Sequence, residues 1–296
     1  MTSHPSLTDF LASRPAVLAR GPLAIILVED DAAVLETLRH HLDIGFRHIL
    51  ALSPDPIPVA PEDAPRVTNL HWQTRDPLAH QGAVNAVMTA VPAGTWLYYC
   101  YNAEFLFFPF SETRSVGELL AFHAEERREA MLTYVIDLYS PDLTRDPNAV
   151  SLSDAMFDRA GYYALGRRGT DGQPLERQLD FHGGLRWRFE EHVAPARRRI
   201  DRIGLFRTAP GLRLEPDHQL NVPEYNTYAC PWHHNLTATI TSFRAAKALA
   251  TTTSTGSGTL TLAAMALAVS TRSASYSDLP TGRPAAARKV LAMPPP

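Results

Sequence analysis

The chain has 296 residues, of which 45% are hydrophobic and 20% are charged, and its formal net charge is −3. These fractions are typical of globular proteins and exclude a wholly disordered chain, and the slightly negative charge argues against a nucleic-acid-binding protein. The length allows one large α/β domain with a well-buried core, or two small domains.

The sequence has no feature typical of a membrane protein or of a disulfide-stabilised secreted protein. Residues 1–20 lack the apolar core of a signal peptide. The longest apolar run, residues 260–269, is about half the length that a membrane helix needs. Two cysteines, Cys100 and Cys230, lie far apart, and the sequence favours buried free thiols over one disulfide. We therefore expect a cytoplasmic protein without a membrane span.

The first hundred residues alternate between short apolar runs and amphipathic segments. Residues 23–28 form a continuous apolar run, which is typical of a strand buried on both faces. Three acids at 29–31 follow and could cap the next helix, which Gly45 ends. Strand, helix and strand at this spacing predict a right-handed parallel crossover. We expect strands at 23–28, 46–52, 67–72 and 96–101, and helices at 34–42 and 79–91.

The pattern is less regular in the second half of the chain. The sequence predicts a helix at 116–128, a strand at 131–139 and a loop-like stretch at 141–176 that is rich in Asp, Pro and Gly. We expect short strands at 186–191, 203–207 and 212–214, and a closing helix at 237–249.

The composition changes sharply after residue 249. Residues 250–296 contain one acid and one aromatic residue among Thr, Ser, Ala and Pro, which favours a disordered tail. A non-native reading frame is the alternative explanation for so abrupt a change. The expected organisation is therefore an N-terminal extension at 1–20, one domain at 21–249 and a low-complexity tail at 250–296.

The first acidic cluster resembles the opening of a response-regulator receiver domain. Residues 26–31 read Ile-Leu-Val-Glu-Asp-Asp and precede an amphipathic helix. In receivers such acids bind Mg²⁺ beside a phospho-accepting Asp at the end of the third strand. Here the next strong central strand ends in residues 99–103, which contain no Asp. Asp76 does not follow an apolar strand. This resemblance is therefore the weaker of two.

Four blocks in chain order resemble family 2-like glycosyltransferases, and together they span about residues 20 to 248. The family pattern has an Asn-Glu pair after the first strand, another Glu six residues later, paired His and Gly-Phe. It continues with a helix that bears an Asn, an Asp-x-Asp-Glu-Phe-Leu block, and a late His followed by Ser-Phe and Lys. The matching positions are Glu29-Asp30, Glu36, His40-His41, Gly45-Phe46, Asn85, Trp96 to Leu106, Trp232-His233-His234, Ser242-Phe243 and Lys247.

This resemblance implies a fold of the GT-A type, which is an α/β fold with a mostly parallel central sheet flanked by helices. It also implies a bacterial-type enzyme that moves a sugar from a nucleotide-sugar donor to an acceptor hydroxyl, with inversion at the anomeric carbon. The acceptor is an unknown glycan, lipid or small molecule. A catalytically inactive relative that binds a nucleotide, a sugar or a protein is the first alternative, and a receiver-type signalling module is the second.

The resemblance also places nucleotide-binding residues. Glu29 and Asp30 would contact the base or the ribose, with helix capping as the structural alternative. Asp55 is a further candidate, with turn formation as the alternative. Arg186 and Lys247, together with Arg188, could neutralise the diphosphate, although most arginines form surface or structural ion pairs.

The metal site is the main departure from the family pattern. Tyr101 and Ala103 stand at the two motif aspartates, and neither is a carboxylate ligand. Asn102 and Glu104 carry oxygen donors on alternate residues and, with His233, could hold Mn²⁺ or Mg²⁺. Loss of the metal site is the alternative.

Three carboxylates are candidates for the base that deprotonates the acceptor. Glu190 and Glu191 follow Gly183-Gly184, where donor and acceptor sugars meet in related inverting enzymes, and Asp217 is the alternative. His40 and His41 lie on a helix away from the strand ends, so we interpret them as structural.

Overall fold

The computed structural model describes residues 4–159, 161–230, 233–234, 236–252 and 273–275, with the backbone alone at 229–230, 233–234, 252 and 273–275. The chain divides into two compact units. The first consists of residues 1–105, 113–133 and 202–236, and the second of 106–112, 134–201 and 237–296.

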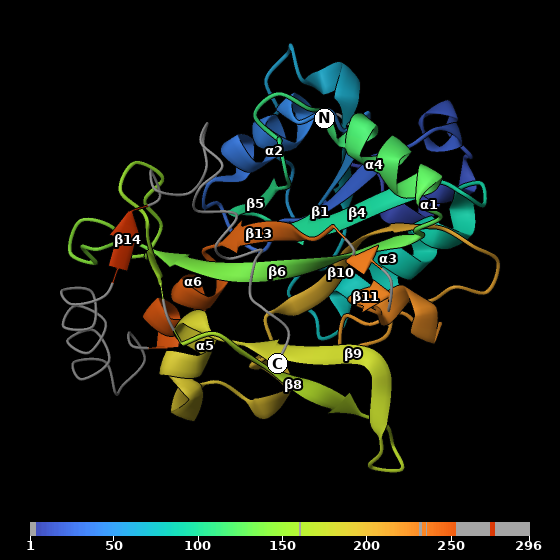
Figure 1. Ribbon diagram of the computed structural model, residues 1–296. Helices are drawn as coiled ribbons and strands as arrows, with labels where there is room; N and C mark the ends of the chain where they lie inside the picture. The colour runs from blue at the N-terminus through green and yellow to red at the C-terminus, as the bar shows by residue number, and fades with distance from the viewer. Residues whose placement is uncertain (1–3, 160, 231–232, 235, 253–272, 276–296) are drawn as a thin grey trace. The chain divides into compact units, whose positions relative to one another are not determined.

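A mostly parallel sheet forms the centre of the first unit (Figure 1). Strands β4, β1, β2 and β3 are neighbours in that order and run parallel, whereas β10 pairs antiparallel with β4. Every residue of β1 is buried, which confirms the prediction from its continuous apolar sequence, and every residue of β2 is buried as well. The bounds are β1 Leu23–Leu27, β2 His48–Ser53, β3 Val67–His71, β4 Trp96–Tyr101 and β10 Asp201–Arg207.

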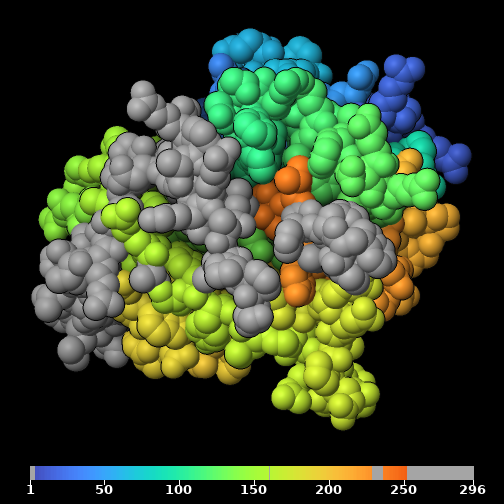
Figure 2. Space-filling view, in the orientation of Figure 1, coloured from blue at the N-terminus to red at the C-terminus, as the bar shows by residue number. Residues whose placement is uncertain are grey.

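Helices cover both faces of this sheet, as an α/β fold requires. Successive residues of β4 face opposite sides: Tyr98 stacks on His41 of α2, with ring centroids 5.2 Å apart, whereas Tyr99 meets His218 on the other face. On that other side α1 packs against α3 and β3. The bounds are α1 Leu7–Ala12, α2 Val34–Asp43, α3 Ala79–Ala90 and α4 Val116–Glu125. The outer face of α4 lies at the surface (Figure 2).

Short elements complete the first unit. They are the 3-10 helices η1 Ala16–Ala19, η2 Ala64–Arg66 and η5 Pro223–Asn226, and the two-residue strands β11 Ala229–Cys230 and β12 His233–His234. Strands β11 and β12 pair antiparallel, with Cys230 opposite His233. The free Cys100 is buried in β4, as expected, while the side chain of Cys230 lies outside the described residues.

The second unit is built from antiparallel strands and short helices. Strand β7 pairs with β6 and with β14, and β8 forms a hairpin with β9 whose tip projects into solvent (Figure 2). Its core cluster contains Tyr139, Leu185, Phe189, Ala246 and Leu249. The bounds are β5 Glu104–Phe107, β6 Ala130–Tyr139, β7 Met156–Asp158, β8 Tyr163–Arg168, β9 Pro174–His182, α5 Gly184–Arg188, η3 Glu190–His192, η4 Pro195–Arg197, β13 Ala238–Ser242, α6 Arg244–Thr252 and β14 Ser273–Ser275. The first two residues of β5 and the first four of β6 belong to the first unit.

The helix expected at 237–249 is wrong in its first half. Residues 238–242 form β13, and the helix begins only at Arg244. Three β-branched residues among these five favour an extended chain. The hydroxyl of Ser242 then accepts a hydrogen bond from the Arg244 N–H (3.2 Å), which helps the helix to begin.

Two further expectations in the second unit are wrong. Residues 184–188 form helix α5, where a strand was expected at 186–191. The stretch 141–176, expected to be a loop, contains β7, β8 and the start of β9. The hairpin turns at Gly169–Gly172, where Gly172 has a φ of +76°, and sequence reasoning missed this turn. In the first unit, a single bridge between Leu214 and Leu220 replaces the strand expected at 212–214.

Structure is also present at both ends of the chain. Within residues 1–20, Leu7 of α1 is fully buried and Ser6 bridges to His71 of β3. Of the expected tail, residues 250–252 complete α6 and residues 273–275 form β14, while the rest lies outside the described residues. No helix among the described residues has the length and apolarity needed to cross a membrane.

His41 is a structural residue of the first unit, as its place on α2 predicted. Its ring is fully buried, stacks on Tyr98, and lies 2.7 Å from the Thr37 carbonyl through Nδ1. Burial, together with the neighbouring His40, lowers the pKa of His41 to about 3. The folded protein therefore holds this ring neutral across the physiological range.

We expect His41 to make the protein acid-sensitive. Its pKa is about 6.5 in the unfolded chain and about 3 when folded, so stability is present above about 6.5 and is lost as the pH falls towards 3. Between about pH 7 and about pH 5 this side chain should cost about 2 kcal/mol. Urea unfolding at both pH values, for wild type and His41→Phe, measures the difference.

The half-buried His182 of β9 provides the matched control. His182→Phe should lose stability on acidification as the wild type does, whereas His41→Phe should lose about 2 kcal/mol less. Equal pH dependence in wild type and His41→Phe would contradict the assignment.

Candidate functional site

The carboxyl ends of the parallel strands in the first unit form the candidate site. The chain runs from β1 through α2 to β2 on one side, and returns through α3 to β4 on the other side of β1. In open α/β sheets, ligands bind in the crevice at such a switch point, beyond the carboxyl ends of the strands. The segments that leave β1 and β4 here are residues 28–32 and 102–103.

Asn102 ties these two segments together. Its Oδ1 accepts a hydrogen bond from the Glu29 N–H at 2.9 Å. Its Nδ2 donates to the Asp30 carboxylate (2.6 Å) and to the Ala32 carbonyl (2.9 Å). The side chain is fully buried, so every bond replaces a lost contact with water. Asn102 therefore shapes the loop that carries the first acidic cluster.

Helix α2 fixes the turn between β4 and β5, which contains Asn102 and Ala103. Ala103 is buried and has a φ of +58°, a conformation that non-glycine residues rarely adopt. The Ala103 N–H donates to Thr37 Oγ1 (2.9 Å), and that hydroxyl donates to the Ala33 carbonyl. Thus the first turn of α2 holds the β4–β5 turn in place.

The loop after β3 completes the edge. The buried Thr74 hydroxyl donates to the Val28 carbonyl at 2.6 Å. The Arg75 Nε donates to the Glu29 carbonyl at 2.7 Å while the residue stays exposed. An exposed guanidinium group is therefore held beside the acidic cluster.

The edge presents carboxylates as well as this cation. Glu29 and Asp30 are half-buried, and Asp55, which follows β2, is exposed. Asp30 Oδ1 accepts from the Ala32 N–H (3.0 Å), which is a bond within the loop, because α2 has Ala33 at its N-cap and no side-chain capping bond. The N–H of Asp55 donates to Ser53 Oγ, so this residue also forms a turn. Carboxylates of this kind can accept hydrogen bonds from ribose hydroxyls or base amino groups.

Glu104 lies two residues after Asn102, but its side chain forms a buried ion pair. The carboxylate accepts from Arg202 Nη2 at 2.6 Å and from the Tyr101 N–H at 2.9 Å. Its side chain is 1% exposed and that of Arg202 is 5% exposed. The Arg202 guanidinium also lies 5.3 Å from the ring centroid of Tyr99. Glu104 therefore neutralises and positions the Arg202 guanidinium group inside the unit.

The predicted metal ligands do not fit a metal site as they lie. The Asn102 oxygen bonds to a backbone N–H and the Glu104 carboxylate bonds to a guanidinium group, which competes with a cation. Among the described side chains, no three His, Cys, Asp or Glu residues could hold a metal ion together. The side chain of His233 lies outside the described residues, so its metal role stays a prediction.

A second polar cluster lies on the α3 side of the sheet, next to the predicted base Asp217. Tyr99 Oη is 3.0 Å from His218 Nδ1, and the His218 ring stacks on His80 with centroids 4.3 Å apart. Burial raises the pKa of Tyr99 well above its usual value, so the phenol stays protonated. Asp217 is exposed, and its Oδ1 accepts from the Gln219 N–H.

The other candidates belong to the second unit. Arg186 bonds to the buried Asp137 (3.3 Å) and to the Arg199 carbonyl (2.8 Å). Burial raises the pKa of Asp137, opposed by the Arg186 charge. Lys247 is buried in α6. Arg186 thus has the structural ion pair that was weighed against diphosphate binding, and Arg188 has the same fate with Asp158 at 2.7 Å.

The two predicted bases of the second unit are exposed on η3. Glu190 lies 3.6 Å from Arg198, and Glu191 lies 3.6 Å from His192. Exposed pairs of this kind contribute little stability, so both carboxylates can accept other partners. Nothing in their surroundings distinguishes one from the other as a base.

Sequence reasoning missed Arg75, Arg202, His80 and His218. Arg75 was detectable, because it follows the third strand of a parallel sheet, where ligand-binding loops gather. Arg202 was detectable as a charge inside an apolar strand, which requires a buried partner. The two histidines are 138 positions apart in the sequence, and nothing local links them.

No family model matches the chain, and a search of curated proteins finds no significant match.

We expect Asn102→Ala to loosen the loop after β1. The change leaves the Glu29 N–H and the Ala32 carbonyl without their partner, and should cost about 2–4 kcal/mol of unfolding free energy. Amide hydrogen exchange at residues 29–32 should accelerate. Asn69→Ala, which removes a single bond to the Ile57 carbonyl, is the control and should leave exchange at 29–32 unchanged. Equal exchange in both variants would refute the role given to Asn102.

The buried pair predicts strongly non-additive mutations. Glu104→Gln leaves the buried Arg202 charge without its counter-ion and should cost about 3–5 kcal/mol. The double variant Glu104→Gln/Arg202→Met removes both charges and should be more stable than Glu104→Gln alone. Urea unfolding of the two single variants and the double variant closes the cycle. Additive losses would show that the two side chains do not depend on each other.

Proposed function

We propose that the chain is a cytoplasmic glycosyltransferase that binds a nucleotide-sugar donor at the carboxyl edge of the first unit. The sugar would pass, with inversion, to a hydroxyl of a glycan, lipid or small-molecule acceptor. The observation that carries the proposal is the hydrogen bonding of Asn102 to Glu29 and Asp30, residues more than 70 positions earlier in the chain. It supports the spatial arrangement that the family resemblance implies for the donor site.

The local chemistry also supports a nucleoside diphosphate as ligand. Glu29 and Asp30 offer half-buried acceptors at the switch point of the sheet, which suit ribose hydroxyls or base amino groups. Arg75 is exposed beside them and, among the described residues, bonds through its Nε to the Glu29 carbonyl. Its remaining N–H groups can neutralise a diphosphate. We therefore assign the leaving-group charge to Arg75, since Asn102 and Glu104 do not fit a metal site.

A catalytically inactive nucleotide-binding relative is the second candidate. Its support is the structural use of Asn102 and Glu104, because the two oxygen donors left in the degenerate motif hold the fold together. The same edge would bind nucleotide without turning it over. For the receiver-type module, Asp76 is exposed in the loop after β3 and no observation favours it. Labelling by acetyl phosphate would be its test.

Isothermal titration with UDP- and GDP-sugars tests the donor site. Wild type should bind at least one of them without Mn²⁺, and Arg75→Gln should weaken binding about tenfold by losing one charge-assisted contact to phosphate. The same variant should bind the matching nucleoside, which lacks phosphate, as wild type does. Glu29→Gln should weaken both ligands.

Arg213→Gln is the matched control, since Arg213 is exposed in the same unit and its backbone bonds to Asn221, not to the loops after β1, β3 or β4. Its affinity should equal that of wild type. Absence of binding to any nucleotide would end the proposal. Binding that requires Mn²⁺ would instead support the metal site predicted from Asn102, Glu104 and His233. Binding without sugar release or transfer favours the inactive relative.

A further inference from the structure

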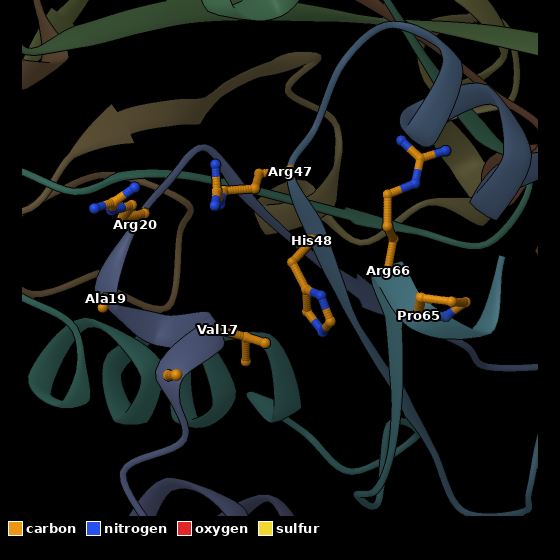
Figure 3. Close-up of a pocket in the computed structure, with 8 residues that line it drawn as sticks. Val17, Ala19, Arg20, Arg47, His48, Pro65 and Arg66 are labelled. Atoms are coloured by element: carbon orange, nitrogen blue, oxygen red, sulfur yellow. The ribbon is translucent and has the colours of Figure 1, made fainter.

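A basic pocket lies at the opposite, amino-terminal end of the same parallel strands. It has a volume of about 590 Å³ and is lined by residues of η1, of the start of β2 and of η2 (Figure 3). Its charged lining residues are Arg20, Arg47 and Arg66, with His48 between them, and no lining residue is acidic. Val17 and Pro65 supply part of an apolar wall. Such a volume suits a small organic ligand.

The sheet itself lines up the three arginines. Arg47 immediately precedes β2 and Arg66 immediately precedes β3, while Arg20 lies three residues before β1. Because β1, β2 and β3 are adjacent and parallel, their amino ends meet at one edge. The Arg47 N–H donates to the Pro22 carbonyl (3.0 Å), which fixes the start of β2 beside that of β1. One cation therefore stands near the start of each of three neighbouring strands.

The described residues do not neutralise the positive charge of these three arginines with ion pairs. Within the described part of the chain, none of the three arginines forms an ion pair. Asp63 lies three residues before Arg66, yet it bonds to Arg39 at 2.8 Å. Among the described residues, these guanidinium groups form one hydrogen bond, a long one from Arg66 to the Leu42 carbonyl (3.5 Å). Like charges on neighbouring strands are unfavourable, so an anion bound between them would stabilise the edge.

The three positive charges of the pocket and the planar shape of the guanidinium group indicate which class of anion would bind. A phosphate monoester or a diphosphate carries about two or more negative charges, which three guanidinium groups can match, whereas one carboxylate would leave two unmatched. The planar forks of arginine donate paired hydrogen bonds to phosphate oxygens. The rest of the ligand would lie against Val17 and Pro65. His48 Nε2 is 2.7 Å from Thr68 Oγ1, so this ring is fixed as part of the wall.

We propose that Arg20, Arg47 and Arg66 form a binding site for a phosphate-bearing ligand, separate from the donor site at the carboxyl edge. The strands between the two edges are five or six residues long, so the sites lie on the order of 15 Å apart. The phosphate belongs either to a soluble phosphorylated molecule or to a lipid headgroup, and the chemistry of recognition is the same.

Titration with pyrophosphate and sedimentation with vesicles test this site on the full-length chain. The vesicles contain phosphatidic acid or, as the neutral reference, phosphatidylcholine alone. Arg47→Gln should weaken binding about tenfold, and Arg47→Gln/Arg66→Gln should weaken it further, since each change removes a charge-assisted contact. Arg213→Gln changes the total charge equally and should bind as wild type does. Circular dichroism confirms that each variant is folded.

The outcomes separate this site from the donor site. Pyrophosphate binding that persists in Arg75→Gln, which weakens the donor site, and that Arg47→Gln weakens in that background supports a soluble ligand. Binding only to phosphatidic acid vesicles, with the same dependence on Arg47, supports a lipid headgroup. The proposal is overturned if wild type binds neither probe, if Arg213→Gln weakens binding as much as Arg47→Gln, or if the binding seen in Arg75→Gln is unchanged when Arg47→Gln and Arg66→Gln are added.

Discussion

The buried amide of Asn102 is the interaction on which the candidate site depends. One planar group accepts from Glu29 and donates to Asp30 and Ala32, so the loop after β1 has one stable arrangement beside the end of β4. An amide suits this position because it supplies donors and an acceptor without a charge. A buried carboxylate here would repel the Asp30 carboxylate and lack the N–H donors. The same engagement removes the Asn102 oxygen from metal chemistry.

The buried charges of Glu104 and Arg202 lie inside the first unit and do not involve the residues of the carboxyl edge. Glu104 and Arg202 neutralise each other out of contact with water, and aromatic rings of β4 cover the guanidinium group. A buried pair of this kind fixes geometry more than it adds stability, since desolvation offsets most of the attraction. A position that the family resemblance associates with metal binding thus holds β4 and β10 in place. Charge available to a ligand is left at the two ends of the strands, with Arg75 at one and Arg20, Arg47 and Arg66 at the other.

Where sequence reasoning failed, long-range contacts or competing propensities determined the local structure or the partner of a side chain. The helix expected at 237–249 has its apolar residues at helical spacing, yet β-branched residues turned its first half into β13. Arg186 was considered for a diphosphate, but the buried Asp137 binds it. The Asn85 side chain exchanges two hydrogen bonds with the backbone of Leu214, a partner 129 positions away. Such pairs leave no local pattern, so periodicity and motif spacing cannot reveal them.

The sequence by itself determined the parallel α/β centre of the first unit. The apolar runs of β1, β2 and β4 and the amphipathic α2 and α3 are local patterns, because hydrophobic burial acts on each segment according to its own periodicity. Only the tertiary structure decided which polar groups meet. Asn102 bonds to the acidic loop, Glu104 pairs with Arg202, and three arginines line one pocket at the amino edge. The physical reason is that a hydrogen bond or an ion pair depends on where a partner lies in space, which strand order and register set and which sequence distance does not record.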